Sequence, residues 1–161
     1  MSMRTSLVVL LLLVGTGCGR APVVRASELL WTASVDLDRQ LADKCVDSGE
    51  LTIAERMLRR SLARPDAAVD EVVRIALRQD LHFALGRVLL LQGRFSRASA
   101  EASRGLALGG QNTVFQANLY GLRAMAVEAD GRPLDALDDY SRALTIHKSL
   151  FDAALAARES T

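Results

Sequence analysis

The chain has 161 residues, of which half are hydrophobic, with 20 basic and 19 acidic side chains. This length allows one domain with a modest core. Its nearly balanced charge gives no support for binding nucleic acid or for attachment to a membrane through basic residues. Few aromatic residues, three prolines and many alanines, leucines, arginines and glutamates predict a mainly helical protein.

The first seventeen residues have the layout of a secretory signal. Arg4 supplies a positive charge, and residues 7–14 are all apolar. A run of eight residues is too short for a transmembrane helix, because a hydrocarbon core of ~30 Å needs ~20 helical residues. We therefore expect residues 1–17 to be a signal peptide rather than a membrane-spanning anchor.

Thr16, Gly17 and Cys18 resemble the lipobox of bacterial lipoproteins, although Gly15 stands where that pattern usually has leucine. The resemblance implies that Cys18 carries lipid and becomes the mature N-terminus, with residues 18–26 as a short linker. An aspartate directly after the cysteine would resemble an inner-membrane retention signal. Gly19 stands there instead, which favours the outer membrane, facing the periplasm. The alternative is a general secretory signal with an incidental cysteine.

The sequence carries no motif that indicates catalysis. It contains no phosphate-binding loop, no nucleophile elbow and no paired-cysteine metal spacing. If Cys18 is lipidated, only Cys45 remains, so no intramolecular disulfide can form and Cys45 is best interpreted as a small buried hydrophobe. His82 and His147 lie far apart in the sequence and in no recognisable motif. We expect no enzyme activity, no metal, no cofactor and no small-molecule substrate.

Three turn glycines, Gly49, Gly93 and Gly131, mark the origin of an internal repeat. Fixed distances from each glycine hold residues of one kind. Five positions later stand Ala54, Ala98 and Ala136; twelve later Ser61, Gly105 and Ala143; thirteen later Leu62, Leu106 and Leu144; and seven earlier Ala42, Gly86 and Ala124. Small residues at fixed offsets on two facing helices let their backbones approach closely, while the leucines fill the space between them.

This pattern resembles the tetratricopeptide repeat (TPR), a helix–turn–helix unit. The middle unit, with Leu85 and Gly86, matches best; Arg123 replaces a leucine in the third, and Asp38 replaces a tryptophan in the first. The resemblance implies an all-α solenoid of about three repeats over residues 27–161, with a C-terminal capping helix. We expect helices near residues 27–47, 50–63, 66–92, 94–108, 113–129 and 133–148. Residues 149–159 would form the cap or continue the sixth helix.

TPR proteins usually bind partners on the concave face lined by the first helix of each repeat. Carried over to this chain, those positions include Arg39, Asp43, Val46, Phe83, Arg87, Leu90, Asn118, Met125 and Glu128. Phe83, Leu90 and Met125 would form an apolar strip beside Arg87, with Arg39 and Glu128 as further contacts, which suits an extended or helical peptide. The alternative is that these residues pack against the cap or a neighbouring helix.

Charge is unevenly distributed, because residues 56–104 are rich in arginine and residues 128–139 are acidic. This pattern indicates either solvated helix faces or a polarised surface that orients a partner. Two functions remain open. One is a membrane-anchored scaffold or assembly factor in a bacterial envelope complex for pilus, secretion or outer-membrane assembly. The other is a structural subunit buried in a larger complex, which large apolar patches on the convex face or termini would favour.

Overall fold

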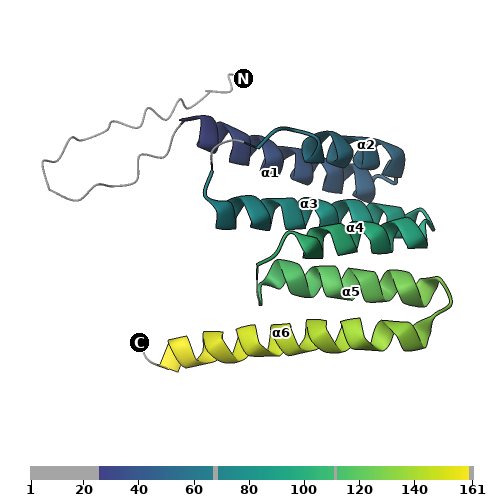
Figure 1. Ribbon diagram of the computed structural model, residues 1–161. Helices are drawn as coiled ribbons and strands as arrows, with labels where there is room; N and C mark the ends of the chain where they lie inside the picture. The colour runs from purple at the N-terminus through teal and green to yellow at the C-terminus, as the bar shows by residue number, and fades with distance from the viewer. Residues whose placement is uncertain (1–25, 67–68, 111, 160–161) are drawn as a thin grey trace, which may run out of the picture.

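The computed structural model describes residues 26–66, 69–110 and 112–159, which form six helices and no strand. In chain order they are α1 (Ala26–Asp47), α2 (Leu51–Leu62), α3 (Glu71–Leu91), α4 (Phe95–Ala107), α5 (Val114–Ala129) and α6 (Pro133–Glu159). They stack as three successive hairpins (Figure 1), so the predicted all-α solenoid is confirmed. The proposed signal peptide, Cys18 and the linker lie outside the described residues, except Ala26, which begins α1. No helix within the described ranges combines the length and the apolar character needed to cross a membrane.

All three hairpins turn in the same way. Gly49, Gly93 and Gly131 have φ values of +77°, +72° and +84°, a left-handed conformation that glycine adopts without strain. After each glycine, the next backbone N–H donates to the carbonyl oxygen five residues earlier: Glu50 to Cys45, Arg94 to Leu89, and Arg132 to Val127. This is the bonding of a Schellman turn, and its repetition confirms that the glycines mark equivalent positions.

The three hairpins stack so that their first helices lie together. Within the described residues, the backbone of α3 lies close to both α1 and α5, whereas the backbones of α2, α4 and α6 do not approach one another. The side of the stack formed by α1, α3 and α5 is therefore its more closely packed, inner side. Each hairpin touches only the hairpins next to it in sequence, as expected for a repeat solenoid.

Small residues allow the helices to cross, as the repeat pattern predicted. Ala54, Ala98 and Ala136 are all fully buried. A Cβ atom built on Gly86 would lie 3.3 Å from the carbonyl oxygen of Ala98 and only 2.5 Å from Leu122 Cδ2. Gly86 thus admits both the second helix of its own hairpin and a leucine of the next, which accounts for glycine in the middle of a helix.

The predicted start of the third helix near residue 66 is wrong, because α3 begins at Glu71. Asp70 caps it by accepting hydrogen bonds from the backbone N–H groups of Val72 (2.9 Å) and Val73 (3.3 Å). The chain before it is held in a non-helical form by contacts distant in sequence. Arg78 donates to the carbonyl oxygen of Arg64 at 2.6 Å, and Trp31 Nε1 donates to that of Pro65 at 3.0 Å.

Of the two alternatives for residues 149–159, the structure has the continuation of the sixth helix and no separate capping helix among the described residues, because α6 runs unbroken from Pro133 to Glu159. No glycine or proline interrupts residues 134–159, so nothing in this segment turns the chain back onto the stack. Every residue from 147 to 159 is exposed, and α6 contacts only α5. The last repeat therefore ends with its outer side uncovered, and the C-terminal segment does not cover the inner face.

Candidate functional site

The inner face is the surface formed by first-helix residues of the three hairpins. Its members are Arg39, Asp43, Asp80, Phe83, Arg87, Leu90, Asn118 and Met125. The repeat offsets place them on the same side of α1, α3 and α5, because residues three, four and seven apart share one helix face. Its two halves differ in chemistry: the α1–α3 half is ionic, and the α3–α5 half is largely apolar.

The ionic half is a network of ion pairs between α1 and α3. Arg87 Nη2 donates to Asp43 Oδ1 at 3.0 Å, Arg39 pairs with the other oxygen of Asp43, and Arg39 Nε lies 3.1 Å from Asp80 Oδ2. That last contact is an ion pair without a hydrogen bond, since Arg39 Nε has no acceptor in line. Burial raises the pKa of Asp80, helped by the nearby charges of Asp43 and Asp36, and the charge of Arg39 offsets this only in part.

The apolar half lies between α3 and α5. Phe83 and Leu90 are partly buried against a cluster made by Ala102, Leu119 and Leu122. Met125 is more open, with 41% of its surface exposed. Phe83 and Leu90 thus serve the core, so only part of each side chain faces solvent, and the apolar strip beside Arg87 stays a prediction.

Two of the predicted contact residues are already engaged within the chain. The side chain of Arg39 is only 15% exposed and is held by Asp43 and Asp80. Glu128 accepts a hydrogen bond from the hydroxyl of Tyr140 at 2.5 Å, which raises the pKa of Tyr140 to about 12. Arg87 is the more available group, because its side chain is 38% exposed and only one nitrogen donates to Asp43.

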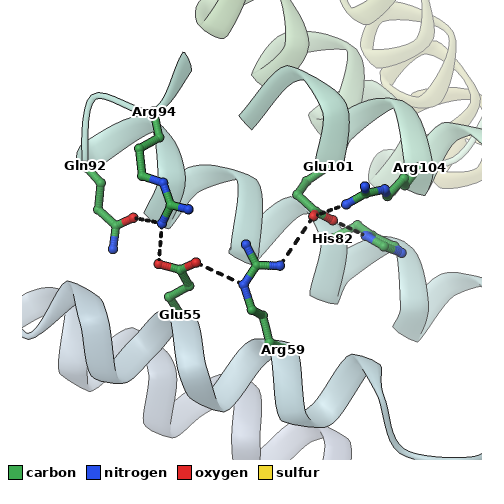
Figure 2. A network of polar contacts seen from close by, with 7 residues as sticks. All are labelled: Glu55, Arg59, His82, Gln92, Arg94, Glu101 and Arg104. Carbon is green, nitrogen blue, oxygen red and sulfur yellow. Dashed lines mark hydrogen bonds and ion pairs between the residues drawn. The ribbon is translucent and has the colours of Figure 1, made fainter. Parts of the chain in front are cut away.

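A second polar cluster, which the sequence did not reveal, joins α2, α3 and α4 on the opposite side (Figure 2). Glu55 accepts hydrogen bonds from Arg59 Nε at 2.9 Å and Arg94 Nη1 at 2.7 Å. Glu101 lies 3.0 Å from His82 Nδ1, is bonded by Arg104, and sits 3.8 Å from Arg59 Nη1. His82 and Glu101 are nineteen residues apart, so only the crossing of α3 and α4 brings them together.

Glu101 is a buried carboxylate, 3% exposed, with His82, Arg104 and Arg59 around it. Burial by itself would raise the pKa of Glu101, but the hydrogen bond with His82 and the charges of Arg104 and Arg59 outweigh it and hold the pKa below its usual value. Shallow cavities of about 200 and 290 Å³ open beside it and share Arg59 and Arg104 in their lining. The backbones of α2 and α4 lie apart. This α2–α4 cluster fastens the outer sides of two neighbouring hairpins through side chains, because Arg59 on α2 reaches Glu101 on α4.

Most of the arginine-rich stretch is neutralised inside the protein. Arg59, Arg64, Arg74, Arg78, Arg87, Arg94 and Arg104 all form ion pairs with acidic side chains. Within the described ranges, Arg56, Arg60 and Arg97 make no such pair. The concentration of arginine thus reflects links between helices and hairpins more than one continuous basic surface. Cys45, partly buried against the core, fits the expected small hydrophobe.

A third feature is a row of exposed apolar side chains along the outward side of α6, which we name the α6 seam. It consists of Leu134, Leu137, Leu144, Phe151 and Leu155, which are 44% to 79% exposed. The polar residues Ser141 and Lys148 continue the same three-and-four spacing. No group of three or more His, Cys, Asp or Glu side chains that could hold a metal ion occurs within the described part of the chain.

No protein-family pattern matches this sequence, and neither does any curated protein. A similar solved structure is that of a TPR-like protein from Chlorobium tepidum TLS. The two share 19% sequence identity with a TM-score of 0.59, over 76% of this chain and 83% of that one. At this identity the likeness concerns the fold alone. Together with the repeated turns and crossing residues, it establishes that the chain has a TPR-like fold.

Proposed function

We propose that this protein is a lipid-anchored scaffold of a bacterial envelope complex, which holds a segment of a partner protein on its inner face. The observation that supports it best is the position of Arg87, a partly exposed cation between the ionic and the apolar halves of that face. A TPR-like fold also presents its first helices as a continuous binding surface, which suits protein partners in general.

The chemistry of the inner face defines the partner segment that would fit. Asp43 uses one nitrogen of Arg87, and the remaining N–H groups of the guanidinium are free to bind a carboxylate. Phe83, Leu90 and Met125 lie toward α5 and would exclude water around such a pair. A partner segment in extended or helical form, with an acidic group next to apolar side chains, matches both halves.

Two substitutions on the inner face test this binding. Arg87→Glu combined with Met125→Glu replaces the positive charge of Arg87 by a negative one and places a second negative charge in the apolar half. A matched control on the other side of the stack is Arg97→Glu combined with Ile53→Glu, since Ile53 is 43% exposed and Met125 41%. We expect partner capture from native envelopes to be lost in the first variant and kept in the control, with both folded by circular dichroism. Equal capture by both variants would exclude the inner face as the binding surface.

The membrane attachment rests on Arg4, the apolar residues 7–14, and the resemblance of Thr16, Gly17 and Cys18 to a lipobox. Mass spectrometry of protein purified from membranes tests it. We expect an N-terminal Cys18 bearing diacylglycerol, and a Cys18→Ala variant that is not processed there. An intact signal, or a free amine downstream of Cys18, would contradict the lipoprotein assignment while leaving the inner-face proposal standing.

One observation favours the second candidate function, a structural subunit within a larger complex. The α6 seam is a large apolar patch at the end of the stack, and such patches on soluble domains mark interaction surfaces. The two candidate functions differ in the surface through which the protein binds the rest of the complex. A structural subunit would tolerate the Arg87→Glu and Met125→Glu pair but lose assembly when the α6 seam is changed.

A further inference from the structure

The repeat register shows that the α6 seam is a stacking surface without its neighbour. Leu62, Leu106 and Leu144 stand thirteen residues after the three turn glycines. Leu62 is partly buried in the core cluster that α1, α2 and α3 share, and Leu106 in the cluster shared with α5. Leu144 is 70% exposed. The position that packs against the next hairpin in the first two repeats is thus open to solvent in the third. Figure 1 shows α6 at the edge of the stack.

We propose that the α6 seam is covered by the α6 seam of a second copy of this chain, the two helices running antiparallel. The seam residues Leu134, Leu137, Ser141, Leu144, Lys148, Phe151 and Leu155 alternate in steps of three and four. This is the spacing with which two helices pack side by side through knobs and holes. The seam lies opposite the side of α6 that buries Ala136, Ala143 and Ile146 against α5, so both sides of the helix can be covered at once.

An antiparallel pair makes the seam complementary to itself. With the centre between residues 142 and 143, Leu134 of one copy lies opposite Phe151 of the other, and Ser141 lies opposite Leu144. At the centre of the pair, the small side chain of Ser141 therefore meets the large side chain of Leu144. Lys148 lies opposite Leu137, where the methylene stem of the lysine covers the leucine and its ammonium group reaches solvent. Each large side chain from Leu134 to Phe151 gains a partner in this register.

The charge of Lys148 selects the direction of the pair. In a parallel pair, equivalent residues of the two helices face each other, so Lys148 would meet Lys148 in the middle of the apolar seam. The antiparallel arrangement separates the two lysines and leaves each beside Asp152 of its own chain, 2.6 Å away.

The difference in length between α5 and α6 favours the same partner. At a rise of ~1.5 Å per residue, the 27 residues of α6 extend ~40 Å, against ~24 Å for the 16 residues of α5. The second half of α6, with Phe151 and Leu155, therefore lies beyond the support of its own chain. In the antiparallel pair, Phe151 rests on Leu134 in the first half of the other α6, which α5 holds in place, and Leu155 lies just beyond the start of that helix.

The test is the mass of the full-length protein in mild detergent, measured by analytical ultracentrifugation with the detergent contribution subtracted. We expect twice the mass of one chain for the wild type and the mass of one chain for Leu144→Glu. Leu30→Glu on α1 is the matched control, because Leu30 is 71% exposed and lies off the seam; its mass should stay double. Circular dichroism checks that all three proteins are folded.

A wild type with the mass of one chain would overturn the proposal. That mass is also the result expected if residues 1–25 of the same chain, and not a second copy, covered the seam. A Leu144→Glu variant that keeps the double mass would overturn the proposal as well. Cysteine cross-linking tests the direction, with the wild type reporting background from Cys18 and Cys45. We expect a mixture of Leu134→Cys and Phe151→Cys chains to form disulfide-linked heterodimers on mild oxidation, and Lys148→Cys alone to form no linked dimer. Linked dimers of Lys148→Cys would exclude the antiparallel pair, because equivalent residues face each other only in the parallel one.

Discussion

Arg123 and Asp139 form a two-pronged ion pair between α5 and α6. Arg123 Nε donates to Asp139 Oδ2 and Nη2 donates to Oδ1, both at 2.6 Å. Asp139 is only 7% exposed, and its hydrogen bond with Arg123 raises the pKa of the guanidinium. Arg123 stands where the TPR pattern has leucine, so the last hairpin replaces an apolar contact with an ionic one.

Removing one partner of this pair should destabilise the protein. Asp139→Ala leaves the Arg123 guanidinium without its carboxylate partner, with only Ser103 Oγ still accepting from it at 3.3 Å. We expect the free energy of unfolding to fall by about 3 kcal/mol, the lower end for buried pairs because Arg123 is 28% exposed. Urea denaturation measures it. The Arg123→Leu, Asp139→Ala double variant should regain most of the loss. If the double variant is as unstable as the single one, the buried charge is not the cause.

A larger residue at the hairpin crossing should also destabilise the fold. Ala98 is fully buried opposite Gly86, so Ala98→Leu overpacks the crossing of α3 and α4, and we expect a cost of about 1–3 kcal/mol. The control is Ala100→Leu, because Ala100 is exposed on the same helix. Thermal unfolding followed by circular dichroism compares the two. An unchanged midpoint for Ala98→Leu would contradict the packing at this crossing.

The lowered pKa of Glu101 predicts a stabilisation that depends on pH. Because the folded state holds the pKa below the ordinary value of 4.5, the charge of Glu101 stabilises the fold above that pH, and this is lost as pH falls through the folded pKa. Glu101→Gln should therefore be less stable than the wild type at pH 7, and the gap should narrow below pH 4.5. Urea denaturation across this range measures the gap; a gap that does not change with pH would refute the prediction.

Asp80 should behave in the opposite way. Its pKa is raised above 3.8, so the contribution of Asp80 to stability is complete below the unfolded pKa and is lost as pH rises through the folded pKa. We expect Asp80→Asn to raise the free energy of unfolding at pH 7 and to have little effect at pH 3. Asp47→Asn, at an exposed position at the end of α1, is the control. A loss of stability at pH 7 would mean that the ion pair with Arg39 outweighs burial.

Local signals in the sequence predicted the hairpins well, because a left-handed turn glycine and a small crossing residue each act over a few positions. Gly93 and Ala98 are examples, and both lie where the repeat placed them. The start of α3 could not be predicted in this way. Pro65 and Asp70 both suit a first turn, and the choice depends on Arg78, whose contacts with residues 62–66 are not visible in the sequence.

The candidate site was predicted in outline but not in its pairings. The repeat register placed Arg87 and Asp43 on one face, yet nothing in the sequence says that these two side chains meet across forty-four residues. The bond between His82 and Glu101 was missed for a similar reason. The available signal was Glu101 itself, a charged residue between Ala100 and Ala102 in a helix that is rich in small residues.

The stacking of hairpins only with their neighbours has a mechanical consequence. Among the described residues, no backbone contact joins α1 to α5 or α6, so force entering at Ala26 reaches the far end of the stack only through the second hairpin. A pull on the N-terminus would therefore act first on α1 and α2, and Arg78, which holds the chain between α2 and α3, would resist their separation from α3. The third hairpin would feel the load only after the second, so the hairpins would separate in chain order.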